Sequence, residues 1–154
     1  MTMETLVRLR LAGRGDVLDR IELVLAAPDI DIDLFGAQMV TLGMMKHPIT
    51  VLVSSDDPAL KVSSRLASRR MRLGLADVHD PAIQKFALNT GIRIVDITQM
   101  ATDDPAHSRY IGMISGEAGI SPGNNPFDGM RNAGAFVFNQ VGGVFQGIGG
   151  VLAE

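Results

Sequence analysis

The stretch ITVLVSSDDP, residues 49–58, joins a short apolar run rich in β-branched residues to two adjacent acids and a proline. Brief apolar runs of this kind are typical of strands buried on both faces of a parallel sheet. Similar runs occupy residues 21–27 and 92–97, with segments of helical length between the three. This order of elements predicts an α/β fold in which about three strands form a parallel sheet flanked by helices.

The tripeptide DPA occurs three times, at residues 57–59, 80–82 and 104–106. An aspartate accepts hydrogen bonds from free N–H groups at a helix N-cap, and proline fits the first helical position because its missing N–H needs no partner there. Three helices are therefore expected to begin near Pro58, Pro81 and Pro105, and the second to end at Gly91. Residues 3–12 are expected to form a further helix.

The 154 residues carry a net charge of -3, are 46% hydrophobic and include no cysteine. This size and hydrophobicity allow one core and at most one domain. Nucleic acid is not an expected partner, because no overall basic field attracts a polyanion. Four arginines form a local basic cluster: Arg65, Arg69, Arg70 and Arg72. This cluster could contact phosphate, although the favoured interpretation is a solvated helix end. Disulfides, thiolate catalysis and cysteine metal sites are excluded.

From Gly116 onward the chain is rich in glycine and nearly uncharged. We therefore divide it into a partial α/β domain, residues 1–118, and a glycine-rich apolar tail, residues 119–154. Polar residues such as Gln146 interrupt this tail, which is barely long enough to span a bilayer. A flexible or loosely docked tail is favoured, and contact of the tail with a membrane is the alternative.

Candidate catalytic residues follow the second and third predicted strands. In an open parallel sheet, ligands bind where the carboxyl ends of the strands meet the loops, and Asp56, Asp57 and His107 fall at such ends. A hydrolytic triad uses a histidine as base and a carboxylate that orients it. Asp57 and His107 have the residue types and the order for these two roles. Alternatively, Asp57 is only a helix cap and His107 only a surface histidine in a first helical turn.

A second acidic group, Asp29, Asp31 and Asp33, follows the first predicted strand. Alternating carboxylates could bind a hard cation such as calcium. No glycine-centred calcium loop surrounds them, so a turn followed by a helix cap is favoured. The sequence therefore predicts no metal site and no cofactor.

The pattern Gly-x-Ser-x-Gly of a nucleophile elbow is matched at residues 119–123, around Ser121. The elbow joins a strand to a helix, and the N–H of the residue after the serine helps to form the oxyanion hole. Here that residue is Pro122, which has no N–H, and no predicted strand leads into it. We therefore reject Ser121 as the nucleophile.

Three stretches carry a resemblance to a known family: LAAPDID at residues 25–31, VSSDDPAL at 53–60 and RLG at 72–74. Together they resemble a bacterial family of α/β-hydrolases in the esterase/lipase superfamily, over roughly residues 3–115. The resemblance implies a carboxyl-terminal portion of a serine hydrolase acting on a small-molecule ester, without the elbow serine and inactive alone. It implies Asp57 as the acid, with Asp56 as the alternate, and His107 as the base. Asp29 on the earlier strand stays open as the acid.

A non-catalytic role is the competing hypothesis. An exposed sheet edge could pair this α/β module with another chain, either a separate amino-terminal half or a second copy of itself. The amino terminus alternates charged and apolar residues, so it is not a secretory signal, and the compartment stays undefined.

Overall fold

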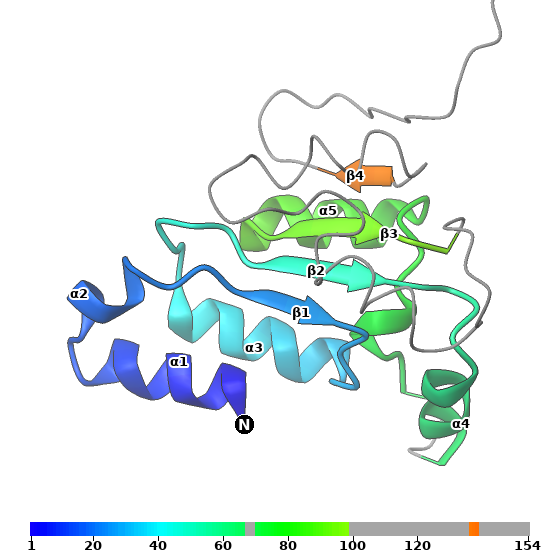
Figure 1. Cartoon of the computed structure of the whole chain (residues 1–154), viewed down its shortest axis with the longest axis horizontal. Coiled ribbons are helices and arrows are strands. Elements are labelled where there is room, and N and C mark those ends of the chain that lie inside the picture. The colour runs from blue at the N-terminus through cyan, green and yellow to red at the C-terminus, as the bar shows by residue number, and fades with distance from the viewer. Residues whose placement is uncertain (67–69, 99–135, 139–154) are drawn as a thin grey trace, which may run out of the picture.

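Three parallel strands form the centre of the fold (Figure 1). The structure, a computed structural model, describes residues 1–66, 70–98 and 136–138. The parallel strands are β1 (Val24–Ala26), β2 (Thr50–Val53) and β3 (Arg93–Asp96), in that spatial order. A further strand, β4 (Phe136–Phe138), pairs antiparallel with β3. The predicted three-stranded parallel sheet is therefore confirmed.

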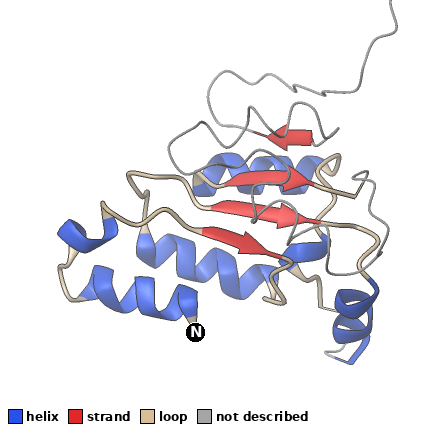
Figure 2. Cartoon of the chain, viewed as in Figure 1, coloured by secondary structure: helices blue, strands red, loops and turns tan. Residues whose placement is uncertain are grey.

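Helices alternate with these strands along the chain (Figure 2). Their bounds are α1 (Thr2–Leu11), α2 (Gly15–Leu18), α3 (Ile32–Leu42), α4 (Pro58–Leu66), the 3₁₀ turn η1 (Leu73–Leu75) and α5 (Pro81–Thr90). Helices α1, α3 and α5 share one buried cluster with Val51, Val53 and Ile94. Alternation along β2 and the pairing of Val51 with Ile94 place these three strand residues on one face of the sheet. The three helices therefore cover that face.

Phe35 of α3 lies at the centre of this core and is fully buried. Its ring centroid lies 6.1 Å from that of Phe86 on α5, in a tilted arrangement. An aromatic pair at this distance adds to the stabilisation from apolar burial. The contact joins the helix after β1 to the helix before β3.

Local capping explains where the helices begin and end. Asp57 and Asp80 accept hydrogen bonds from the first N–H groups of α4 and α5, which begin at Pro58 and Pro81 as predicted. Gly91 ends α5 in the left-handed conformation, with φ 68° and ψ 20°. The helix predicted at Pro105 lies outside the described residues.

Strand β1 departs from the prediction. It is shorter than the predicted run at residues 21–27, and it is not buried on both faces, because the Val24 side chain is 50% exposed. The cause is its position: β1 is the outer strand of the sheet order, so among the described strands only β2 pairs with it. Burial on both faces holds instead for β2, where Val51, Leu52 and Val53 are all buried.

Strand β4 falls in the segment that we assign to the apolar tail, where the sequence predicts no strand. Three of these residues therefore pair with the sheet. Within the described residues, no helix is both long and apolar enough to cross a membrane.

Candidate active site

The loops that follow β1, β2 and β3 lie together at the carboxyl end of the sheet, because all three strands run in the same direction (Figure 1). Asp29 follows β1, Asp56 and Asp57 follow β2, and Thr98 follows β3. The predicted position of Asp56 and Asp57 at the carboxyl end of a parallel strand is therefore confirmed. Three loops from distant parts of the sequence meet there.

Asp57 is buried, with 4% of its surface exposed. Its Oδ1 accepts hydrogen bonds from the backbone N–H groups of Ala59 at 2.9 Å and Leu60 at 3.1 Å. These two donors compensate for the loss of water around a buried carboxylate. The predicted cap role is confirmed. No hydrogen bond from the described residues reaches Oδ2, so one oxygen of this carboxylate remains available at the sheet edge.

Asp56, the alternate acid, differs from its neighbour in both burial and partners. Its side chain is exposed and accepts a hydrogen bond from the hydroxyl of Ser54, two residues earlier. Ser54 itself is buried. The Asp56 carboxylate therefore stabilises its own loop, whereas Asp57 is enclosed by the protein.

A network between two loops holds this acidic segment against the end of β3. The N–H of Ser55 donates to the Thr98 hydroxyl at 3.0 Å, across 43 residues of sequence. Both the N–H and the hydroxyl of Thr98 donate to Asp96 Oδ1, at 2.8 and 2.5 Å. Sequence reasoning missed Asp96 and Thr98. The available signal is an Asp-x-Thr sequence at the end of a strand, which is typical of a local side-chain-to-backbone turn.

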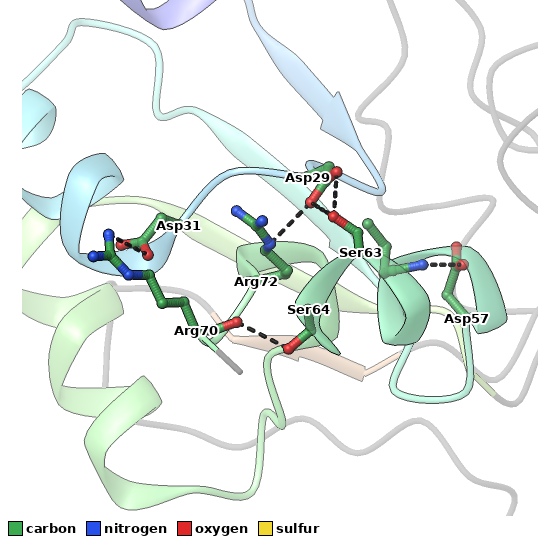
Figure 3. Close-up of polar contacts among 8 residues, drawn as sticks. Asp29, Asp31, Asp57, Ser63, Ser64, Arg70 and Arg72 are labelled. Carbon is green, nitrogen blue, oxygen red and sulfur yellow. Dashed lines mark hydrogen bonds and ion pairs between the residues drawn. The ribbon is translucent and has the colours of Figure 1, made fainter. Parts of the chain in front are cut away.

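Asp29, the third candidate acid, is engaged in structural contacts (Figure 3). The Ser63 hydroxyl of α4 lies 2.8 and 2.7 Å from its two carboxylate oxygens, and Arg72 Nε lies 3.1 Å from Oδ1. The Arg72 N–H is not aligned for a hydrogen bond, so this contact is an ion pair. Asp29 therefore ties the loop after β1 to α4 and to the segment that precedes η1.

The acids of the second group do not converge on one point. Asp31 caps α3 by accepting from the N–H groups of Asp33 and Leu34, and its other oxygen lies 3.7 Å from Arg70. The predicted turn and helix cap are confirmed at Asp31. Asp33 is exposed. In the part of the chain that the structure describes, no three His, Cys, Asp or Glu residues lie close enough to hold a metal ion.

Gly74 joins the ends of β1 and β2. Its N–H donates to Pro28 O at 3.1 Å, and its carbonyl accepts from Ser54 N–H at 2.9 Å. A Cβ at this position would lie 3.0 Å from both Ala27 C and Pro28 N. A glycine therefore allows the close approach that brings Asp29 and Asp57 to the same edge.

The two described histidines fall in different places. His47 lies 3.6 Å from Glu22, before β2 and so at its amino end, and His79 is exposed in the loop before α5. His107, the predicted base, and Ser121, the rejected nucleophile, lie outside the described residues. The contact between Asp57 and His107 therefore stays a prediction.

Comparison with protein-family models gives a match over more than half of the chain. A family model described as alpha/beta hydrolase of unknown function (DUF900) matches residues 1–114. No curated protein and no solved structure matches the chain.

Proposed function

Because the chain belongs to this family of α/β-hydrolases, we propose that it is the carboxyl-terminal part of a serine hydrolase that cleaves a carboxylic ester. In this proposal Asp57 is the acid and His107 is the base. The observation that carries it is the buried Asp57 carboxylate at the end of β2, with one oxygen free of hydrogen bonds from the described residues. A buried carboxylate at the edge where ligands bind is suited to orienting a histidine.

The mechanism assigns each residue a separate step. His107 takes the proton from the nucleophile hydroxyl as that oxygen attacks the ester carbonyl, and later returns a proton to the leaving alcohol. Asp57 holds the imidazole in the correct tautomer and stabilises its charged form. The serine is expected on an elbow that precedes α1 in a longer chain. The 154 residues alone are expected to lack acyl-enzyme chemistry.

The burial and contacts of the three acids favour Asp57. Asp56 is exposed to water and bound to Ser54, so its charge is screened. The Ser63 hydroxyl lies within hydrogen-bond distance of both oxygens of Asp29 and shares its one proton between them, and Oδ1 also lies beside Arg72. Neither has the combination of burial and a free oxygen that Asp57 offers.

An ester assay tests the assignment of the nucleophile. We expect the 154-residue chain to hydrolyse p-nitrophenyl acetate no faster than its Ser121→Ala variant. A longer chain that reads upstream in frame through an elbow serine should be faster by a factor on the order of a million in kcat. Robust turnover by the short chain that disappears in Ser121→Ala would show that our rejection of Ser121 is wrong.

A second candidate function is a module that pairs through its sheet edge. The backbone groups Leu23 O and Ala27 N bond to β2, so by alternation those of Val24 and Ala26 point to the open side. Beside this edge lies a groove of about 490 Å³ between β1, the first turn of α1 and α3. Gln38 Oε1 in its lining is buried without a hydrogen-bond partner. These features suit an added strand, from a second copy or from a separate amino-terminal half.

Sedimentation equilibrium tests the self-pairing form of this second function. The wild-type chain is expected to dimerise as its concentration rises, and Val24→Lys should keep it monomeric because an edge lysine opposes strand pairing. Val40→Lys, at an exposed position on α3, is the matched control and should dimerise like the wild type. A wild-type chain that stays monomeric throughout contradicts self-pairing.

A further inference from the structure

Helix α4 stands apart from the other helices (Figure 1). It presents an apolar stripe, formed by Val62 and Leu66, to solvent. Leu60 is its one buried residue. Val62 and Leu66, four residues apart and so on the same side of the helix, are 53% and 83% exposed. At roughly 100° per residue they lie away from Leu60. The outward side of α4 therefore exposes two large apolar side chains one turn apart.

Two side-chain contacts fix the rotation of α4 about its axis (Figure 3). The Ser63 hydroxyl binds the Asp29 carboxylate, and the Ser64 hydroxyl donates to Arg70 O at 2.9 Å. Both serines flank the buried Leu60 on the helical wheel. Because the helix is anchored on this side, Val62 and Leu66 cannot turn inward without breaking these contacts.

Two cations border the apolar stripe. Lys61 and Arg65 are also four residues apart, and both are exposed. Within the described part of the chain neither side chain forms a hydrogen bond or an ion pair. Together with Ser64 and Leu75 they line an open hollow of about 610 Å³. No carboxylate is among these described lining residues, so the described part of this lining is cationic.

We propose that α4 is a docking surface for an anionic membrane. Val62 and Leu66 enter the boundary between headgroups and acyl chains, while Lys61 and Arg65 bind lipid phosphates beside them. Charge complementarity favours an anionic membrane as the partner of this surface. The protein has a net charge of -3, yet α4 exposes two cations beside two apolar side chains. A free phosphate ion would satisfy the cations but leave the apolar stripe in water.

This inference does not depend on the proposed hydrolase activity. The inference adds a location for that activity. Because α4 begins next to Asp57, docking would hold the candidate acid beside the lipid surface. The helix is short, so we expect weak and reversible binding that salt reduces.

Vesicle co-sedimentation of the full 154-residue chain tests the proposal. We expect stronger binding to vesicles of 30% phosphatidylglycerol in phosphatidylcholine than to phosphatidylcholine alone, with a loss of binding in 0.5 M NaCl. Lys61→Gln combined with Arg65→Gln should weaken partitioning about 25-fold, since each cation at an anionic surface is worth roughly fivefold. Leu66→Ser should weaken it about tenfold through lost apolar burial.

Matched controls separate α4 from the rest of the surface. Lys46→Gln with Lys85→Gln removes the same charge from exposed positions elsewhere, and Val40→Ser removes an apolar side chain that is 85% exposed. Both should bind like the wild type, and circular dichroism should show every variant folded. Absent binding, equal binding to both vesicle types, or binding unchanged by the α4 substitutions would each overturn the proposal, the last by assigning the contact to another segment.

Discussion

Asp57→Asn, introduced into a longer chain that carries the elbow serine, is expected to lower kcat for a short-chain ester by a factor on the order of ten thousand. An asparagine cannot stabilise the imidazolium, and it favours the wrong tautomer of the base. The fold should survive, because asparagine caps a helix as well as aspartate does and can still accept from the N–H groups of Ala59 and Leu60. Steady-state kinetics with a urea unfolding curve measure both effects.

Parallel substitutions at the other two acids make the assignment specific. Asp56→Asn should change kcat less than tenfold, because its exposed carboxylate is solvated by water and is not held at the end of the strand by helix N–H donors as that of Asp57 is. Asp29→Asn should mainly lower stability, since it weakens the contacts with Ser63 and Arg72. A loss at Asp29 or Asp56 that equals the loss at Asp57 would contradict the proposed acid. So would full activity of the Asp57→Asn enzyme.

Gly74→Ala is expected to reduce the free energy of unfolding by about 3 kcal/mol, the upper part of the range for overpacking. Its Cβ would lie 2.6 Å from Leu60 Cδ1 and 3.0 Å from two backbone atoms, Ala27 C and Pro28 N. The leucine side chain can rotate away, but the backbone cannot move without disturbing the hydrogen bonds to Pro28 and Ser54. For a chain of this length, the melting temperature should fall by about 10 °C.

Two further variants test that explanation. Gly15→Ala is the matched control, because its Cβ would meet no atom within 4 Å; its stability should change by less than about 0.5 kcal/mol. In the double variant Leu60→Ala with Gly74→Ala, part of the clash is relieved, so the combined loss should be smaller than the sum of the two single losses. Additive losses, or a Gly74→Ala protein as stable as the wild type, would contradict a steric role for this glycine.

The elements predicted correctly are those whose signals lie within a few residues. The caps at Asp57 and Asp80 act on N–H groups two or three residues later, and the end of α5 needs only the left-handed conformation of Gly91. The strands β2 and β3 are apolar runs of the expected length. For these elements, local hydrogen bonding and hydrophobic pattern were sufficient.

The burial of β1 could not be predicted in the same way. Its sequence is as apolar as that of an inner strand, but the exposure of Val24 depends on which strands lie beside it in space. The contact of Ser55 with Thr98 spans 43 residues, and that of Asp29 with Ser63 spans 34. No local pattern indicates such pairs, because packing of the whole sheet sets their distances.

The sequence by itself therefore determined the order along the chain of the three parallel strands, the starts of α4 and α5, the family, and the position of Asp56 and Asp57 at the end of a strand. Only the tertiary structure distinguished the acids: Asp57 is buried under its own helix, Asp56 faces water, and Asp29 is bound by Ser63 and Arg72. It also showed that α4 presents its apolar stripe outward. The physical reason is that helix caps and strand positions follow from neighbouring residues. The burial of a side chain, and whether its oxygens find hydrogen-bond donors, depend on contacts between residues far apart in the sequence.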